Sequence, residues 1–196
     1  KEEIISKSKK KVDVKFFNKK KCLRIINVAR FTDQKDHITL LKSFKEIIKK
    51  INARLLILGY GPNKSKIKQF IKKNNFREKI KIINFQLNPY TFIKKSDLLI
   101  LSSKYEGLPN VILEALCLNV FVISSKCPTG PKEILENGKF GYLFNVGDHK
   151  DLSEKIIKFM KFKNNSKKMI KLGYKSLDRF DYNLNCEKYL KVIKNL

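Results

Sequence analysis

Six short apolar segments alternate with helical patterns along this chain, and the alternation limits the possible fold more than any other feature. The segments are rich in Ile, Leu and Val without regular apolar–polar alternation, as expected for parallel strands buried on both faces. They are Arg24–Ala29, Arg54–Leu58, Ile80–Phe85, Leu98–Leu101, Val120–Ile123 and Tyr142–Phe144. Strand–helix units repeated in this way predict an α/β fold with a doubly wound, parallel, Rossmann-like sheet.

Apolar residues recur at helical spacing between these segments, because residues three and four apart share one face of a helix. One stripe comprises Leu40, Leu41, Phe44, Ile47, Ile48 and Ile51. A second stripe, of Ile67, Phe70 and Ile71, follows Pro62 and Asn63, which are typical of a helix start. Further helices are predicted over Pro89–Ser96, Val111–Leu118, Pro131–Glu136, Leu152–Phe162, Ser166–Leu177 and Asn185–Ile193.

The length of 196 residues supports one α/β domain with a proper core and is too short for two. Residues 1–21 are a charged, weakly patterned lead-in, and residues 22–196 are predicted to form the domain. No continuous apolar run approaches the ~20 residues that a membrane helix needs. The four cysteines are far apart and include no C-x2-C pair, which indicates free thiols in a reducing cytoplasm.

The net charge of +26, from 44 Lys and Arg against 18 Asp and Glu, raises the question of nucleic-acid binding. Nearly all of the positive charge is Lys, and Lys, Ile, Asn and Phe are over-used together throughout the sequence. An AT-rich genome produces this co-enrichment, because the codons of these residues are rich in A and T. Nucleic-acid binders concentrate basic residues with exposed aromatic residues, and the sequence shows no such patch. We therefore expect no nucleic-acid partner, whereas attraction to an anionic membrane surface stays open.

Two carboxylates follow the predicted strand Leu98–Leu101 at a spacing that points to ligand binding. Ligands of open α/β sheets bind beyond the carboxyl ends of the strands, which is where Glu106 falls. Gly107 permits close backbone approach, and amides opening the next helix face an anion. Glu114 lies about one turn into that helix, where it can accept hydrogen bonds from sugar hydroxyls. The alternative is that Glu114 is a first-turn acid that stabilises the helix dipole and Glu106 a solvated loop residue.

Arg30 and Lys35 leave the carboxyl end of the first predicted strand five residues apart. A rigid guanidinium and a flexible ammonium at this position can clamp a pyrophosphate. A surface pairing of Arg with Asp is the alternative. Asp36 can cap the following helix in either case. His37 opens that helix, and we expect it to lie on the surface.

The E-x7-E block after a buried strand, together with the Arg–Lys loop, resembles the donor site of retaining glycosyltransferases of the GT-B fold, in the large family 4 group. The resemblance extends from about Arg24 to the final helix. It implies that Arg30 and Lys35 contact the donor diphosphate, that Glu106 orients the sugar hydroxyls and that Glu114 accepts from the ribose. It further implies that the backbone facing the sugar and the β-phosphate comes from Gly107, Leu108, Pro109, Asn110 and Val111.

Other loops carry weaker versions of the family's motifs. Gly59 and Gly61 resemble its Gly-x-Gly-Pro element, in which the glycines let the loop pass close to the nucleotide. In relatives the backbone near Phe85 contacts the base. Gln86 stands where the family commonly has Gly, which leaves the nucleobase preference open. The stretch from Cys127 to Pro131 resembles bacterial surface-polysaccharide transferases that use N-acetylated sugars, and we expect it to fix the backbone without side-chain chemistry.

The resemblance implies a nucleotide-diphospho-sugar donor and no cofactor. The expected nucleotide is UDP, and an N-acetylhexosamine is one option for the sugar. No metal is expected, because the sequence has no DxD pair after a strand and Arg, Lys and helix amides supply the positive field. The expected acceptor is lipid-linked or a polysaccharide in bacterial envelope or capsule assembly. The expected location is the cytoplasm, or the inner face of the membrane.

GT-B enzymes have two Rossmann-like domains, and every motif here matches the second, nucleotide-sugar-binding one. Residues 1–21 are then a remnant of the interdomain linker, and 185–193 is a helix that crosses back to an N-terminal acceptor domain supplied in cis or in trans. Three alternatives stay open at this point. They are an inactive fragment, a GT-B-like sugar-nucleotide epimerase and a non-catalytic basic binding module.

Overall fold

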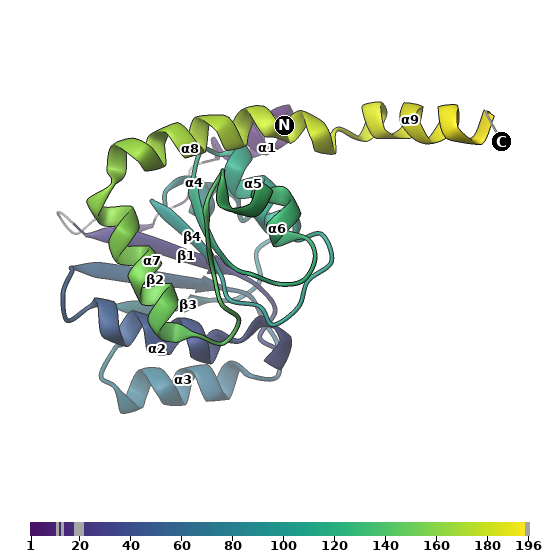
Figure 1. Ribbon diagram of the computed structural model, residues 1–196. Coiled ribbons are helices and arrows are strands. Elements are labelled where there is room, and N and C mark those ends of the chain that lie inside the picture. Colours follow the sequence, from purple (N-terminus) through teal and green to yellow (C-terminus); the bar gives the residue numbers. More distant parts are fainter. Residues whose placement is uncertain (11, 13, 18–21, 195–196) are drawn as a thin grey trace.

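In the computed structural model, which describes residues 1–10, 12, 14–17 and 22–194, six parallel strands form one sheet (Figure 1). The order across the sheet is β3-β2-β1-β4-β5-β6. The strands are β1 (Leu23–Val28), β2 (Ala53–Leu58), β3 (Ile80–Ile83), β4 (Leu98–Leu101), β5 (Phe121–Ser125) and β6 (Tyr142–Phe144). The doubly wound Rossmann-like prediction is confirmed, since the chain builds the sheet outward from β1 on one side and from β4 on the other.

All six predicted strands are present, with shifts of one or two residues at their ends. The largest difference is at the third strand, which was predicted to continue to Phe85 but ends at Ile83. β3 is an edge strand that pairs only with β2, and its last residue faces Leu58, the last residue of β2. Asn84 and Phe85 therefore have no strand beside them to pair with.

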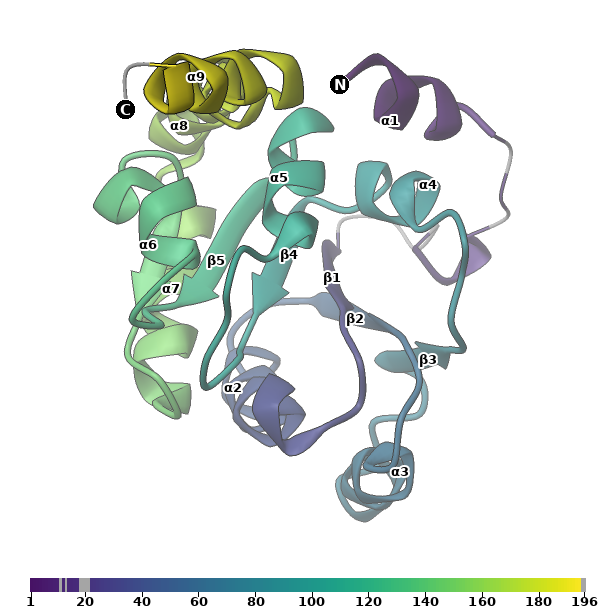
Figure 2. The ribbon, with the colours of Figure 1, turned by 90° about the vertical axis from the view of Figure 1, so that its right-hand side faces the viewer.

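Helices cover both faces of the sheet, as Figure 2 shows when the sheet is seen nearly end-on. On β1, the side chain of Ile25 packs into one core and that of Ile26 into the other, because successive strand residues point to opposite faces. The first core lies under α2 (His37–Ile47), α3 (Lys64–Lys73) and α7 (His149–Lys161). The second lies under α1 (Glu2–Lys7), α4 (Tyr90–Lys94) and α5 (Asn110–Cys117).

The remaining helical elements follow the last strands. α6 (Pro131–Ile134) precedes β6, and α8 (Lys163–Ser176) follows α7 and reaches both cores through Met169 and the adjoining Leu177. Short 3₁₀ turns occur at Lys15–Phe17, Asp33–Lys35, Glu136–Gly138 and Leu177–Phe180. The helices predicted over Ser166–Leu177 and Asn185–Ile193 are present, as α8 and as a final helix at Tyr182–Lys194. Each begins three residues earlier than predicted.

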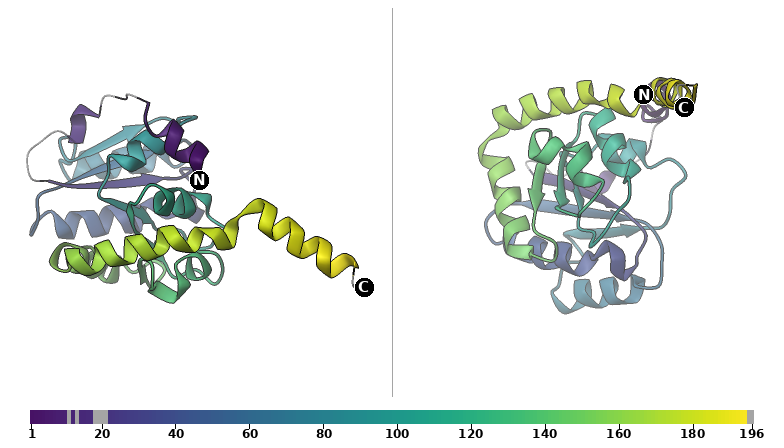
Figure 3. Two further views of the ribbon diagram at one scale, coloured as in Figure 1. Left: turned by 90° about the horizontal axis from the view of Figure 1, so that it is seen from above. Right: turned by 45° about the vertical axis from the view of Figure 1, so that its right-hand side comes forward.

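The N-terminal helix packs on the domain, whereas the C-terminal helix extends away from it. α1 packs against α4 and α5, and Val14 and Phe17 are buried, so the described part of the lead-in is attached to the domain. Residues 11, 13 and 18–21 of the predicted linker lie outside the described residues, and its role as a linker stays a prediction. α9 (Tyr182–Lys194) extends away from the body of the protein (Figures 1 and 3).

Candidate functional site

The residues predicted to bind a ligand gather along one edge of the sheet. The loops that follow β1, β2, β3 and β4 all begin at the carboxyl ends of parallel strands and therefore emerge on the same side. β1 and β4 are neighbours although β2 and β3 lie between them in sequence, which makes the gap between their loops the topological switch point where ligands of such sheets bind. Arg30 and Lys35 belong to the loop after β1, and Glu106 to the loop after β4.

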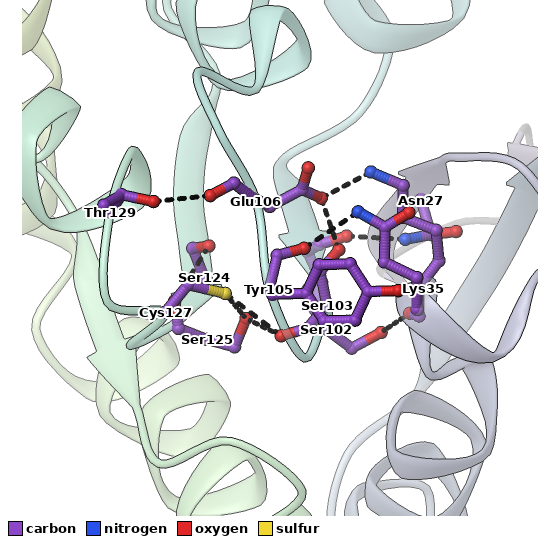
Figure 4. A network of polar contacts seen from close by, with 12 residues as sticks. Asn27, Lys35, Ser102, Ser103, Tyr105, Glu106, Ser124, Ser125, Cys127 and Thr129 are labelled. Carbon is purple, nitrogen blue, oxygen red and sulfur yellow. Dashed lines mark hydrogen bonds and ion pairs between the residues drawn. The ribbon is translucent and has the colours of Figure 1, made fainter.

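A short ion pair joins these two loops (Figure 4). Lys35 Nζ lies 2.5 Å from Glu106 Oε1, and their side chains are only 15% and 7% exposed. Ser103 Oγ donates to the same carboxylate oxygen at 2.5 Å. The alternative of Glu106 as a solvated loop residue is therefore wrong. The carboxylate is buried, charge-paired and directed by two donors.

Further hydrogen bonds hold the two loops against each other. Ser102 Oγ donates to the Lys35 carbonyl at 2.9 Å. Gln34 Nε2 donates to the Tyr105 carbonyl at 2.9 Å, and the Lys104 amide donates to the Gln34 carbonyl at 2.8 Å. Hydrogen bonds to backbone carbonyls thus connect the loops after β1 and β4, in addition to the ion pair. Together they fix the distance between the basic and acidic groups.

A surface hollow of about 360 Å³ opens beside the loop after β1. Arg30, Phe85 and Glu114, three residues predicted to bind the nucleotide, line it. Tyr60 lines it as well, with its ring 5.7 Å from that of Phe85 at 81° between the ring planes. Both rings are more than half exposed. The sequence did not lead us to assign Tyr60 to the site. The available signal was an aromatic residue between Gly59 and Gly61, in the loop after β2.

Glu114 lies in the hollow and away from the helix start. It is the fifth residue of α5, whose first turn contains no acidic residue, so the alternative of a first-turn acid that stabilises the dipole is wrong. Burial raises the pKa of the Glu114 carboxyl above its ordinary value. Arg30 is exposed and forms no ion pair among the described residues, so the predicted alternative of a surface Arg–Asp pairing finds no support there. The hollow thus combines a carboxylate and a guanidinium with aromatic walls.

The backbone at the start of α5 is open to a ligand. The helix begins after Pro109 without a side-chain cap, so its first amides remain available. Leu108 and Asn110 are exposed, and Val111 lines the hollow. A Cβ added to Gly107 would have nothing within 4 Å. A ligand can therefore approach the backbone of this segment closely.

Gly59 and Gly61 fit a tight contact within the protein. A Cβ on Gly59 would lie 1.9 Å from the Ala29 carbonyl oxygen, and one on Gly61 would lie 2.7 Å from the Phe31 oxygen. Both have positive φ, of 155° and 142°. The glycines let the loop after β2 pack on the loop after β1, and Gly59 also lines the hollow. Contact between Gly61 and a nucleotide stays a prediction.

The prediction of a surface position for His37 is wrong. Its side chain is 3% exposed, and its ring meets that of Phe31 edge-on at 5.2 Å and 88°. Asp36 caps α2 as predicted, accepting from the Thr39 amide at 3.2 Å, and the turn that it forms directs His37 inward. Burial lowers the pKa of His37 to about 4. His37 is a polar residue directly after the helix cap, and the sequence did not indicate that its imidazole packs against Phe31.

The described residues contain neither a metal-binding cluster nor a membrane-spanning helix. No group of three His, Cys, Asp or Glu side chains is placed to hold a metal ion, and the expectation of a metal-independent reaction stays a prediction. No described helix is both long and apolar enough to cross a membrane. The four cysteines form no disulfide.

Comparisons with known proteins identify the family of this chain. The family model for glycosyl transferases group 1 matches residues 8–176. An uncharacterized glycosyltransferase of Methanocaldococcus jannaschii is 46% identical over 111 residues, which are 56% of this chain and 27% of that protein. The N-acetylgalactosamine-N,N'-diacetylbacillosaminyl-diphospho-undecaprenol 4-alpha-N-acetylgalactosaminyltransferase of Campylobacter jejuni is 27% identical over 169 residues, covering 85% of this chain and 46% of its own.

Solved structures show the same fold. The crystal structure of Anabaena HepE in complex with UDP superposes with a TM-score of 0.80 at 17% identity, over 89% of this chain and 49% of HepE. The C-terminal domain of LpcC, a glycosyl transferase group 1 family protein from Francisella tularensis, superposes with a TM-score of 0.72 at 18% identity, over 87% of this chain and 93% of that domain. The chain spans half or less of the length of the two relatives and of HepE. With a parallel sheet of GT-B type and a family match over most of its length, the chain belongs to the glycosyl transferases group 1 family.

Proposed function

We propose that this chain is the donor-binding half of a retaining glycosyltransferase that takes its sugar from a nucleotide-diphospho-sugar. The observation that carries the proposal is the placement of Arg30 and Glu114 in one hollow, connected through their own loops to the buried Lys35–Glu106 pair. These four side chains supply separate contacts for ribose, diphosphate and sugar. The three parts of such a donor follow each other along the same edge of the sheet.

The hollow suits the nucleoside. Its aromatic walls, Tyr60 and Phe85, offer the flat apolar surface that a base needs. Glu114 accepts hydrogen bonds from the ribose hydroxyls, and charge-assisted bonds of this kind are the stronger ones. UDP is the nucleotide that we propose, and the UDP complex of Anabaena HepE supports this choice.

The diphosphate meets positive charge from three sources. Arg30 presents a planar guanidinium from the exposed loop after β1, which binds phosphate through two parallel hydrogen bonds. An ammonium group has three donors, so Lys35 can bind Glu106 and a phosphate oxygen together. The first amides of α5 add the partial positive charge of a helix start. No metal ion is required to neutralise the leaving group.

Glu106 is placed to orient the sugar. Its two donors from described residues, Lys35 and Ser103, both reach Oε1, which leaves Oε2 to accept from a sugar hydroxyl. In the proposed reaction the bond from the anomeric carbon to the phosphate oxygen breaks, and the acceptor oxygen forms its bond on the same face. The acceptor proton passes to the departing phosphate, and Arg30 and Lys35 stabilise the charge that develops there, an effect typically worth a few kcal/mol.

The acceptor side is proposed from the relatives alone. The Campylobacter jejuni relative is named for transfer of N-acetylgalactosamine to a diphospho-undecaprenol-linked sugar, which supports an N-acetylhexosamine donor and a lipid-linked or polysaccharide acceptor in envelope assembly at the cytoplasmic face of a membrane. An acceptor domain, in cis or in trans, completes the cleft. The exposed Tyr189, Leu190, Val192 and Ile193 of α9 are available to pack against it.

Calorimetric titration of the chain with UDP, uridine and pyrophosphate tests the proposal. We expect Arg30→Ala to weaken UDP and pyrophosphate binding by about 1–3 kcal/mol, the range for hydrogen bonds to charged groups, and to leave uridine binding nearly unchanged. Arg77→Ala is the matched control, because Arg77 is exposed and precedes β3 at the opposite edge of the sheet. Failure of the parent chain to bind UDP, with binding to anionic vesicles or RNA instead, would refute the proposal in favour of a basic binding module.

A further inference from the structure

The stretch after β5, from Cys127 to Gly130, touches the loop that carries Glu106, and Figure 4 shows the contacts of Cys127 and Thr129. Cys127 Sγ donates to the Ser103 carbonyl at 3.2 Å. Thr129 Oγ1 donates to the Glu106 carbonyl at 2.6 Å. A Cβ on Gly130 would lie 1.8 Å from the Gly107 oxygen. The sequence predicted a stiff backbone here without side-chain chemistry, whereas the structure shows side-chain hydrogen bonds to the segment that carries Glu106.

Ser103 connects the same segment to β5. It is fully buried, and its carbonyl accepts from Ser125 Oγ at 2.5 Å as well as from Cys127. Its hydroxyl donates to Glu106 Oε1 at 2.5 Å. A rigid strand therefore fixes the main chain of Ser103, and the side chain of Ser103 in turn directs the carboxylate.

Side-chain packing does little to hold the segment in place on its solvent side. Tyr105 is 61% exposed and Leu108 is 50% exposed, and Gly107 has open space around the position of a Cβ. With so little apolar contact on that side, the polar contacts from the loops after β1 and β5 supply the restraint. A loop with few buried contacts otherwise opens at a low free-energy cost.

We propose that Thr129 and Ser103 are positioning residues for Glu106, with Thr129 fixing its peptide carbonyl and Ser103 fixing its carboxylate. The inference rests on the proposed role of Glu106 in orienting the donor sugar, and it extends that role to a second loop, after β5. Neither residue needs to touch the ligand. The expected ligand of the positioned carboxylate is a hydroxyl group of the hexose. The nucleotide is instead held by groups outside the loop after β5, namely the hollow with Arg30 and Glu114, Lys35 and the first amides of α5.

The separation of sugar and nucleotide contacts provides the test. The parent chain, Thr129→Val, Thr129→Ser and Ser103→Ala are titrated with UDP and with UDP-glucose, UDP-galactose and their N-acetylated forms. The measured quantity is the ratio of the dissociation constants of UDP and of the tightest-binding UDP-sugar. Ser65→Ala is the matched control, because Ser65 is exposed on α3. Thermal unfolding of every variant verifies folding.

We expect Thr129→Val and Ser103→Ala to lower this ratio about tenfold, the effect of losing one directing hydrogen bond, while affinity for UDP changes less than twofold. Thr129→Ser keeps the hydroxyl and should restore the ratio, which a merely structural role for the methyl group would not predict. A ratio that is unchanged in Thr129→Val, or equal losses for UDP and the UDP-sugar, overturns the inference. Absence of UDP binding by the parent instead overturns the proposed function.

Amide hydrogen exchange of the unliganded chain gives a readout that needs no ligand. Thr129→Val should speed exchange over residues 104–108 about tenfold, and Ser65→Ala should leave it unchanged. If the parent binds UDP and UDP-sugars equally well, this measurement decides the inference. Unchanged exchange over residues 104–108 then refutes the proposal that Thr129, in the loop after β5, holds the Glu106 segment in place.

Discussion

Protonating His37 should destabilise the fold, because a charged imidazole is unfavourable at its buried position. The side chain is 3% exposed, and among the described residues neither ring nitrogen has a hydrogen-bond partner. Burial lowers the pKa to about 4 from an ordinary value of 6.5, with Asp36 opposing the change and Lys35 adding to it. Between these two values the unfolded chain binds a proton that the native chain does not.

The sign and size of the effect follow from this difference in proton binding. Stability falls as the pH drops below about 6.5, because protons bind preferentially to the unfolded state, and the loss is complete below about 4. A pKa lower by about 2.5, at 1.36 kcal/mol for each pH unit, corresponds to about 3 kcal/mol in total. At pH 5.5 the expected loss from His37 alone is about 1 kcal/mol.

Urea unfolding at pH 7.5, 6.5, 5.5 and 4.5 measures the loss. Carboxylates also titrate in this range, so the quantity of interest is the difference in unfolding free energy between the parent and His37→Gln at each pH. The difference should shift in favour of His37→Gln by about 1 kcal/mol between pH 7.5 and 5.5. His149→Gln, a change at the only other histidine, serves as the control. A parent-to-variant difference that stays constant over the whole range would show that His37 is not held neutral by burial.

Two further predictions concern the acidic side chains of the site. Lys35→Met should destabilise the fold by about 3 kcal/mol, because it leaves a buried Glu106 carboxylate without its partner, and adding Glu106→Gln should recover part of the loss in a double-mutant cycle; purely additive losses would contradict a buried pair. Glu114 has a raised pKa in the native state, so its contribution to stability is present below its ordinary pKa and is lost as the pH rises through the native value. The stability of Glu114→Gln relative to the parent should therefore increase from pH 4 to pH 8, and this variant should distinguish ribonucleotides from deoxyribonucleotides poorly. The control Glu154→Gln, at an exposed position of α7, should match the parent in both measurements.

Much of the architecture was predictable because local patterns and the fold agree. The all-buried strand β2, with the sequence Ala-Arg-Leu-Leu-Ile-Leu, has no alternation of apolar and polar residues, and only a strand covered on both faces tolerates that pattern. The start of α2 was equally readable from Asp36 as a cap. Strand ends were less predictable, since the end of β3 depends on the length of its neighbour β2 and not on its own residues.

Side-chain environments were harder to predict than elements. His37 and Asp36 are adjacent and polar, yet one is buried against Phe31 and the other caps a helix. The direction of a first-turn side chain depends on the loop packed beneath it, which the sequence of the helix does not specify. Tyr60 was missed for a related reason, because its partner Phe85 follows a different strand. Contacts between loops require the strand order, and strand order is a property of the whole sheet.

The Lys35–Glu106 pair shows how strand order adds chemistry to a motif. Each residue was predicted as a separate contact to the donor, but they lie 71 positions apart and meet only because β1 and β4 are neighbours. Their pairing means that the unliganded site holds one buried negative charge already balanced by one positive charge, which lowers the cost of burying both. In the proposed function, the three donors of the ammonium let Lys35 bind a diphosphate oxygen while it still holds Glu106 Oε1, so the carboxylate keeps its orientation when the phosphate arrives. The positive clamp and the sugar-orienting carboxylate therefore bind the donor as one unit, in which Ser103 holds the carboxylate of Glu106 and the loop after β5 holds its peptide carbonyl.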